Sequence, residues 1–418
     1  MHRLLWLTEN YPPDRGGMSV SCDRIVRGLR RASVQVDVVH LDRGFPDAAH
    51  TINTTWNRIR ATASETTHIV AFGGYLPMLA APAFAAWLDR PLVTLIRGNE
   101  LDAGLFDPRR RPMLEDALRR SAAVCTVTTE HAEKIAALFG IEPRVIANGI
   151  DFDLWQATDG DRARVRTVIP SGVGTVIPSG VEGSGRAAGA PPTPPAPSTT
   201  LGMTKVLGFF GHLKSKKGVP FFLDVLRKTR HEFHLLIVGE GELALDDFEH
   251  TRVAAVDRFE LIPFYLSCDF VVLPSHYDGF PNVLIESAAL GVPAVASKVG
   301  GMNDLPAAIL FEPGNEHACR AAIDRAARMT PEEISALGAE AARLAREKCD
   351  ARDEARRYAE VFDDSVLRDR RRPRASRPRT ARADEARTAR SRRDPDEERG
   401  AADHGWDPDD HVRRFPVV

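Results

Sequence analysis

Two acidic residues stand eight positions apart in the segment SHYDGFPNVLIESAALG, residues 275–291. Asp278 precedes a Gly-Phe-Pro-Asn turn, and Glu286 lies inside the apolar helix that the turn introduces. If Pro281 takes the first helical position, where its missing amide hydrogen costs nothing, the unpaired amides and positive end of the helix face the loop that holds Asp278. Such an end suits a phosphate or sugar oxygens. The residues alone leave this interpretation equal to plain capping and solvation.

A basic loop, GFFGHLKSKKG, could supply the counter-charge for such a ligand. A strand that ends at Gly211 would bring His212, Lys214, Lys216 and Lys217 to the carboxyl edge of a sheet, where open α/β folds bind ligands. Several cations there match a diphosphate. Taken alone, this indication is weak, because a lysine-rich loop is usually just solvated.

Glycines follow predicted strands at two further places. In IVGEGEL, Gly239 and Gly241 lack the third glycine of a dinucleotide fingerprint, which favours a tight turn. In NYPPDRGGMSV, Gly16 and Gly17 would let backbone amides approach an anionic ligand, although a bare turn explains them equally well.

These motifs lie in two series of alternating strand-like and helix-like segments, which is typical of βα units on parallel sheets. We therefore predict an α/β fold with two domains in tandem, residues 1–160 and 204–350, and a terminal helix at 351–367 that returns to the first domain. Residues 163–203 carry the tandem copies TVIPSGVG and TVIPSGVE and a Gly/Pro-rich run, so we predict a flexible insert. The Arg-rich residues 368–418 are predicted to be disordered.

Composition points to a cytoplasmic enzyme. The 56 Lys+Arg residues nearly balance 58 Asp+Glu, which argues against a specific nucleic-acid binder. The five cysteines are too widely separated for a zinc site, and no apolar run approaches the roughly 18 residues that span a bilayer. The Arg-rich tail is either solvated or makes an electrostatic contact with an anionic partner, which is a peripheral membrane surface or a nucleic acid bound without sequence specificity.

The segments VIANGID, GHLKSKKG, VGEGEL and CDFVVLPSHYDGFPNVLIESAALGVPAVASKVGG resemble the retaining glycosyltransferases of family 4. The resemblance covers residues 1–160 and 204–366 and is strongest in the second domain. It implies a GT-B fold, in which two Rossmann-like domains face each other across a cleft. It also implies a UDP-, GDP- or ADP-sugar donor held mainly by the second domain, and no metal or other cofactor.

The resemblance assigns roles to residues that match the family's motifs. Asp278 would contact hydroxyls of the donor sugar, Glu286 the nucleotide ribose, and Lys217 the diphosphate, whose departure it would assist. The donor-binding residues that it further implies are Gly211, Gly239, Gly16, Gly17, Gly279, Phe280, Pro281, Asn282 and Val283.

Three positions depart from the family pattern. Asp278 replaces the more usual Glu and shortens the reach by one methylene. His212 stands where Arg is frequent, so it must be protonated beside the diphosphate or leave the charge to neighbouring lysines. Arg97 stands near where many members have His at the cleft wall, and with Asn99 it would hold an anionic acceptor or donor group.

The expected reaction moves a sugar from a nucleotide-diphosphate sugar to a hydroxyl of a glycan, lipid or small molecule, with retention of anomeric configuration. One alternative is a GT-B sugar-nucleotide epimerase or hydrolase, which needs no acceptor. Another is a non-catalytic scaffold whose tail binds anionic surfaces. Asp151-Phe152-Asp153 spells the D-x-D metal signature of another glycosyltransferase fold, but no third ligand is near in the sequence, and we predict no metal site.

Overall fold

The structure, a computed structural model, places most of the chain. The described residues are 2–14, 16–41, 47–60, 63–168, 204–212, 215–305 and 307–371. Predictions for the insert beyond Val168, for the tail beyond Arg371 and for Lys214 lie outside these residues.

The first sheet has six parallel strands in the order β2-β1-β3-β4-β5-β6. Alternate residues of β1 point to opposite faces, so Leu4 and Trp6 join one hydrophobic core and Leu5 and Leu7 join another. Burial on both faces explains why these strands are continuous apolar runs. The elements are β1 (Arg3–Thr8), α1 (Gly17–Arg31), β2 (Gln35–His40), α2 (Ala48–Ile59), η1 (Ala63–Glu65), β3 (His68–Phe72), α3 (Tyr75–Leu88), β4 (Leu92–Ile96), α4 (Glu100–Phe106), α5 (Arg111–Arg120), β5 (Ala123–Thr126), α6 (Thr129–Phe139), β6 (Arg144–Val145) and α7 (Asp159–Val168).

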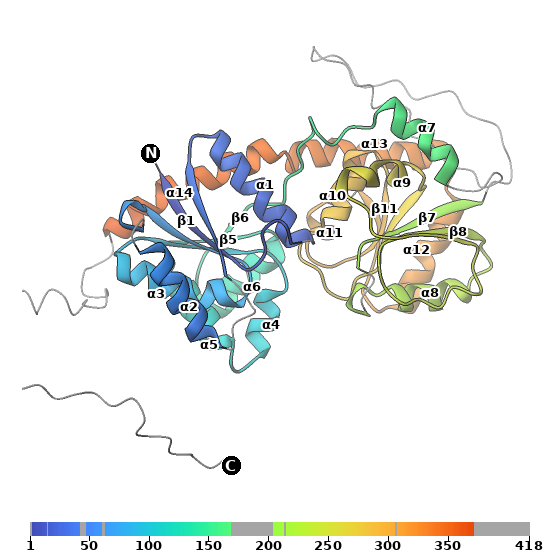
Figure 1. Cartoon of the computed structure of the whole chain (residues 1–418). Helices are drawn as coiled ribbons and strands as arrows, with labels where there is room; N and C mark the ends of the chain where they lie inside the picture. Colours follow the sequence, from blue (N-terminus) through green and yellow to red (C-terminus); the bar gives the residue numbers. More distant parts are fainter. Residues whose placement is uncertain are drawn as a thin grey trace, which may run out of the picture. The chain divides into compact units, whose positions relative to one another are not determined.

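The second sheet also has six parallel strands, in the order β12-β11-β10-β7-β8-β9. Helices cover each sheet, and both sheets belong to one compact unit (Figure 1). The elements are β7 (Lys205–Phe210), η2 (Ser215–Lys217), α8 (Val219–Arg227), β8 (Phe233–Val238), β9 (His250–Val253), η3 (Arg258–Leu261), α9 (Ile262–Leu266), β10 (Phe270–Leu273), α10 (Asn282–Ala289), β11 (Ala294–Ser297), α11 (Gly301–Asp304), β12 (Ala308–Phe311), α12 (Glu316–Arg328), α13 (Pro331–Lys348) and α14 (Ala351–Arg371).

The predicted α/β fold with two series of strands and helices is confirmed. The sequence patterns did not predict one strand of the second sheet, β9. Strand β9 has the sequence HTRV and lies at the edge of the second sheet, where none of its residues is fully buried. An edge strand needs no continuous apolar run, and four mixed residues carry too weak a pattern to predict it.

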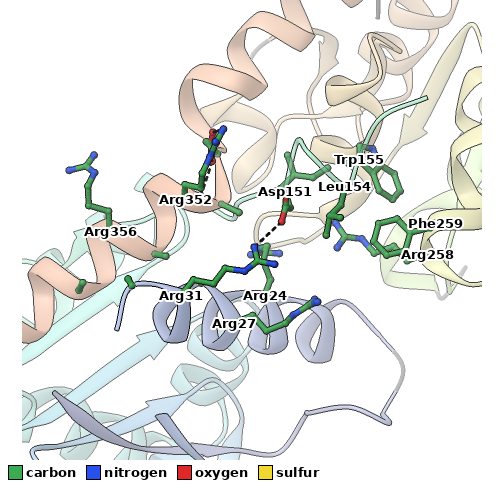
Figure 2. Close-up of a pocket in the computed structure, with 17 residues that line it drawn as sticks. Arg24, Arg27, Arg31, Asp151, Leu154, Trp155, Arg258, Phe259, Arg352 and Arg356 are labelled. Carbon is green, nitrogen blue, oxygen red and sulfur yellow. Dashed lines mark hydrogen bonds and ion pairs between the residues drawn. The ribbon is translucent and has the colours of Figure 1, made fainter. Parts of the chain in front are cut away.

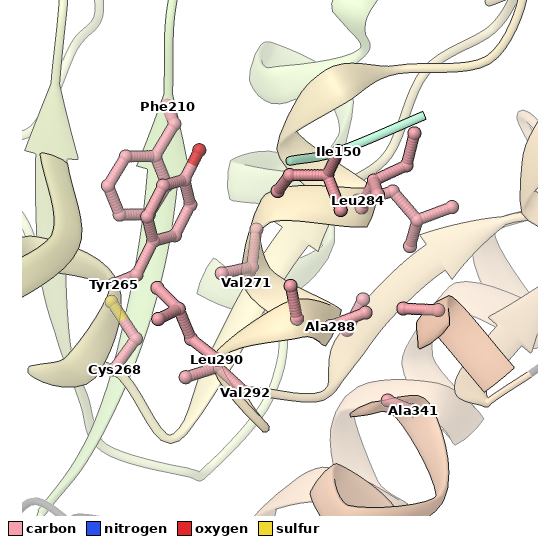
Figure 3. Packing of buried hydrophobic residues seen from close by; sticks show 14 of the residues in the cluster. Ile150, Phe210, Tyr265, Cys268, Val271, Leu284, Ala288, Leu290, Val292 and Ala341 are labelled. Carbon is pink, nitrogen blue, oxygen red and sulfur yellow. The ribbon is translucent and has the colours of Figure 1, made fainter. Parts of the chain in front are cut away.

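Helix α10, which carries Glu286, is fixed by a tightly packed core (Figure 3). Leu284 and Ala288 belong to the same buried cluster as Val271 of the neighbouring strand β10. Ile150, from the segment that leaves the first sheet, joins this cluster. The position of α10 therefore depends on both halves of the chain.

Helix α14 returns from the second half to pack against α1 (Figure 1). The two helices approach so closely at Gly28 that a Cβ atom added there would lie 2.8 Å from Cβ of Ala355. Tyr358 and Phe362 of α14 are buried in the core of the first sheet. The imidazole Nε2 of His68, at the start of β3, lies 3.0 Å from the Phe362 carbonyl oxygen.

The buried His68 should make folding sensitive to acid. Burial lowers the pKa of His68 from its usual 6.5 to about 4, so between these pH values the unfolded chain binds a proton that the folded chain rejects. Stability is therefore complete above pH 6.5 and falls as the pH drops towards 4. Between pH 7 and 5 we expect the free energy of unfolding to fall by about 2 kcal/mol more in wild type than in His68→Gln, measured by urea denaturation. Equal losses in both proteins would contradict this.

Candidate active site

The carboxyl edge of the second sheet brings two predicted site residues into contact. Lys217 ends η2, which follows β7, and Asp278 follows the adjacent strand β10. Lys217 Nζ lies 2.5 Å from Asp278 Oδ2, and both side chains are partly buried. The residue predicted to bind diphosphate and the residue predicted to bind the sugar therefore form an ion pair with each other.

Local hydrogen bonds fix the Asp278 carboxylate at the entrance of α10. Ser275 Oγ donates to Oδ2 over 3.3 Å, and the Gly279 amide donates to Oδ1 over 3.1 Å. The helix begins at Asn282, so Pro281 stands at the N-cap position instead of the first helical position that we predicted. The shift is one residue, and the helix N-terminus still follows the loop of Asp278.

Glu286 lies deeper than its partner acid and is almost fully enclosed. Arg258 Nε donates to its Oε1 over 2.8 Å, and the Tyr265 hydroxyl donates to its Oε2 over 2.9 Å. Burial, reinforced by the adjacent carboxylate, raises the pKa of Tyr265 well above its usual value, so the hydroxyl stays a donor. A ribose bound here would have to share Glu286 with both groups. Sequence reasoning missed Arg258 and Tyr265 because neither belongs to a recognisable spacing.

The other predicted residues of this edge are arranged around the ends of β7 and β8. His212 is exposed, and its Nδ1 lies 3.6 Å from Glu240 Oε2. Gly239 has a φ of +134°, and a Cβ atom added there would lie 2.2 Å from the carbonyl oxygen of Gly211. Only glycine permits this close approach, which agrees with the tight turn that the sequence favoured.

Loops of the first domain touch the turn before α10. Asn282 Nδ2 donates to the Gly17 carbonyl over 3.3 Å, and the Tyr277 hydroxyl donates to the Gly98 carbonyl over 3.1 Å. A Cβ atom added at Gly279 would lie 2.9 Å from Cα of Gly98. The predicted donor turn, which also contains Phe280 and Val283, therefore lies directly against the glycine loop and the loop after β4.

Helix α6 adds a second contact between the halves. The Gly300 amide donates to Glu130 Oε2 over 2.9 Å, and the Thr129 amide donates to Asp304 over 3.1 Å. Burial alone would raise the pKa of Glu130, but hydrogen bonds from the Lys134 ammonium and the Gly300 amide hold it below its usual value. Glu130 is therefore ionised at neutral pH and strengthens the contact.

Arg97 is enclosed in a polar network and not exposed on the wall of a cleft. Its Nη1 donates to the Tyr358 hydroxyl over 2.6 Å, and its Nη2 donates to Asn148 Oδ1 and lies 3.7 Å from Glu354 Oε1. An acceptor contact by Arg97 stays a prediction, and it would require this network to open. Asn99 is exposed at the start of α4, where its side chain makes no cap.

Asn148 connects that network to the donor turn. Its Nδ2 donates to the Phe280 carbonyl over 2.7 Å, and its Oδ1 also accepts from Arg24 Nη2 over 3.4 Å. The segment VIANGID pointed to a family, but its sequence gave no sign of this role. The partners of Asn148 lie more than 50 positions away in the chain, beyond the reach of any local pattern.

The D-x-D segment makes ordinary protein contacts. Asp151 accepts from Arg31 Nη1 over 3.3 Å and from the Asp153 amide over 3.1 Å. Among the residues that the structure describes, no three His, Cys, Asp or Glu side chains are placed to hold a metal ion. Within that same part of the chain, no helix is both long and apolar enough to cross a bilayer.

The network predicts that Arg97 matters for stability. Arg97→Met keeps the apolar stem but removes the buried donor of the Tyr358 hydroxyl and leaves Asn148 Oδ1 with the 3.4 Å bond from Arg24. We therefore expect the free energy of unfolding to fall by about 3 kcal/mol in chemical denaturation. The exposed neighbour Asn99 provides the control, and Asn99→Ala should change stability by about 0.5 kcal/mol or less. A fully stable Arg97→Met protein would show that the network contributes little.

Two family models match the chain. "Glycosyl transferases group 1" matches residues 204–328, and "Glycosyltransferase Family 4" matches residues 15–154. Glycogen synthase of Mycobacterium tuberculosis is 28% identical over 246 residues, which cover 54% of this chain and 50% of that protein. The match thus spans about half the length of that relative. An uncharacterized glycosyltransferase of Methanocaldococcus jannaschii is 23% identical over 355 residues, which cover 72% of this chain and 82% of that protein.

The fold also matches a solved structure. HepE of Anabaena, in complex with UDP and glucose, superposes with a TM-score of 0.65 at 17% identity, over 87% of this chain and 100% of that one. At this identity the likeness concerns the fold alone. The two parallel sheets, this superposition and the two family models lead to one conclusion: the chain is a GT-B protein and belongs to the family 4, group 1 glycosyltransferases.

Proposed function

We propose that the protein transfers a glycosyl group from a nucleotide-diphosphate sugar to a hydroxyl acceptor, with retention of anomeric configuration and without a metal. The observation that carries this proposal is the Lys217–Asp278 pair at the N-terminal end of α10, directly opposite the Gly16–Gly17 loop of the first domain. A cation, an acid and a helix N-terminus at one sheet edge match the diphosphate and hydroxyl groups of such a donor.

Donor binding exchanges the partners of this ion pair. The diphosphate carries more negative charge than one carboxylate, so it attracts the Lys217 ammonium away from Asp278. The freed carboxylate then accepts hydrogen bonds from hydroxyls of the sugar. In the same way, the Glu286 carboxylate accepts a hydrogen bond from a ribose hydroxyl in place of the one from Arg258. Each group of the donor thereby replaces an interaction that these side chains make within the protein.

The chemical step places the largest demand on Lys217. As the acceptor oxygen bonds to the anomeric carbon, the bond from that carbon to the phosphate oxygen breaks. The departing phosphate oxygen takes the proton of the acceptor hydroxyl, and attack on the face of the leaving group retains the configuration. Lys217 stabilises the negative charge that develops on the departing diphosphate. His212, when protonated, adds a second cation at this edge.

The contacts between the two halves support a water-excluding role for the first domain. The Gly17, Gly98 and Asn282 contacts hold the loops against the donor turn, and bound donor would lie behind them. Exclusion of water favours transfer to the acceptor over hydrolysis. The likeness to HepE, which is described with UDP and glucose, supports a nucleoside diphosphate as the leaving group.

Variants of the two acids and the lysine test the proposal. A thermal-shift screen of UDP, GDP, ADP and their sugars first identifies the donor, since a ligand at 100 times its Kd stabilises by about 2.7 kcal/mol. With that donor, Lys217→Ala should lower the transfer rate by about 10²-fold or more, and Asp278→Ala and Glu286→Ala by at least about tenfold each. Lys228→Ala, an exposed lysine paired with Glu316, is the matched control. Wild-type rates in the three variants would exclude this site.

Substitutions that change the charge at position 212 test whether His212 helps to bind the diphosphate. Arginine at this position would carry a permanent positive charge, whereas glutamine would carry none. If His212 contributes charge to diphosphate binding, His212→Gln should weaken donor binding by about fivefold or more and His212→Arg should not, measured by calorimetric titration. Equal donor affinities in both variants and wild type would assign the charge at this edge to the lysines.

A further inference from the structure

A second polar site lies away from the Lys217–Asp278 pair. A cavity of about 360 Å³ is enclosed by α1, residues 150–155, η3 and the start of α14. We call it the arginine pocket, because six arginines and two acids are among its lining residues. The arginines are Arg24, Arg27, Arg31, Arg258, Arg352 and Arg356, and the acids are Asp151 and Asp350.

Arg24 forms the buried part of this pocket. Only 7% of the residue is exposed, and Nε and Nη2 donate to the Glu354 carboxylate over 2.8 and 3.0 Å. Its Nη1 is buried and has no hydrogen-bond acceptor among the described residues. A buried guanidinium donor without an acceptor is costly, and Arg24 would gain an acceptor if its guanidinium turned towards an anion in the pocket that it lines.

The exposed arginines Arg27 and Arg356 are paired with acids outside the pocket lining, so the charge that favours an anion is the buried one. Arg24 and Arg97 both lie against Glu354, so two buried positive charges share one carboxylate. At the mouth, Arg31 pairs with Asp151 across the pocket, as Figure 2 shows, and Arg352 pairs with Asp350. Both arginine side chains at the mouth are highly exposed, at 68% and 74%, so either can turn towards a bound anion at little cost.

The rim of the pocket is apolar. Leu154 and Phe259 are about half exposed although both are large hydrophobic residues, and both line the cavity (Figure 2). A basic floor with an apolar rim matches a phosphate group carried on a small organic body. The volume lies in the lower part of the range for small-molecule pockets, which fits a pentose-sized phosphate monoester better than a whole nucleotide sugar.

Two contacts connect the arginine pocket to the helix of the proposed donor site. Arg258, which lines the pocket, donates to Glu286, and Trp155, which also lines it, donates to the Glu286 carbonyl over 3.0 Å. Arg24 contacts Asn148, which holds the Phe280 carbonyl before α10. An anion that attracts Arg258 would release Glu286 for the ribose and so favour donor binding.

We propose that the arginine pocket binds a small phosphate monoester and that this binding raises the affinity of the donor site for its nucleotide. The coupling part rests on the proposed function, whereas the binding part stands on the pocket alone. Because coupling between two binding sites is reciprocal, the nucleotide must raise the affinity for the monoester by the same factor.

Calorimetric titration of the full chain with ribose 5-phosphate tests the binding. Inorganic phosphate serves as the smaller anion and ribose as the uncharged control. We expect saturable binding of ribose 5-phosphate at one molecule per chain, both without nucleotide and with saturating nucleotide, and tighter binding in the second case. Competition between the two ligands would place the anion in the donor site, and failure of both phosphates to bind would overturn the proposal.

Charge reversal at the mouth locates the site. The double variant Arg31→Glu/Arg352→Glu should weaken ribose 5-phosphate binding by about tenfold or more, as expected when a charge-assisted hydrogen bond is lost. Arg343→Glu, an exposed arginine of α13 outside the pocket, is the matched control and should bind like wild type. Equal affinities in the double variant and wild type would overturn the assignment. If nucleotide fails to bind wild type while ribose 5-phosphate binds, the donor proposal fails and the pocket stands.

Discussion

The buried cluster of Arg24, Arg97 and Glu354 constrains how the chain can fold. A charged side chain that is buried in a protein must be paired with an opposite charge. If one partner of the pair is removed, the other remains as an unpaired buried charge, which strongly destabilises the fold. Glu354 can serve both guanidinium groups only if α1, the end of β4 and α14 meet at one place. Asn148 then extends the same cluster to the carbonyl of Phe280, so the turn before α10 is positioned by charges that lie outside the proposed donor site.

The fold was largely predictable because its signals are local and repeated. Parallel strands that are buried on both faces appear in the sequence as unbroken apolar runs. The segments with Gly211 and Asp278 follow two of these strands and so mark the carboxyl edge of the sheet, where open α/β folds bind ligands. The meeting of Lys217 with Asp278 could be expected because β7 and β10 are adjacent in a fold of this class. Strand β9, at a sheet edge, has no such run.

The arrangement of the buried polar groups was not predictable, for a physical reason. The partner of Arg97 in α14 is 261 residues away, and that of Arg24 is 330 residues away. A hydrogen bond between such residues leaves no periodic trace in the sequence. Arg97 was expected on a cleft wall because the family resemblance placed it there. Arg258 and Tyr265 received no role, although both hold Glu286.

Helix α14 bears on how the protein is made. Tyr358, Val361 and Phe362 complete one face of the core that β1 begins, although they are translated some 350 residues later. Until α14 has been made, that face of the first sheet has α1 as its cover but lacks these three side chains. The half of the protein that is synthesised first can therefore complete its core only after the second half has been synthesised.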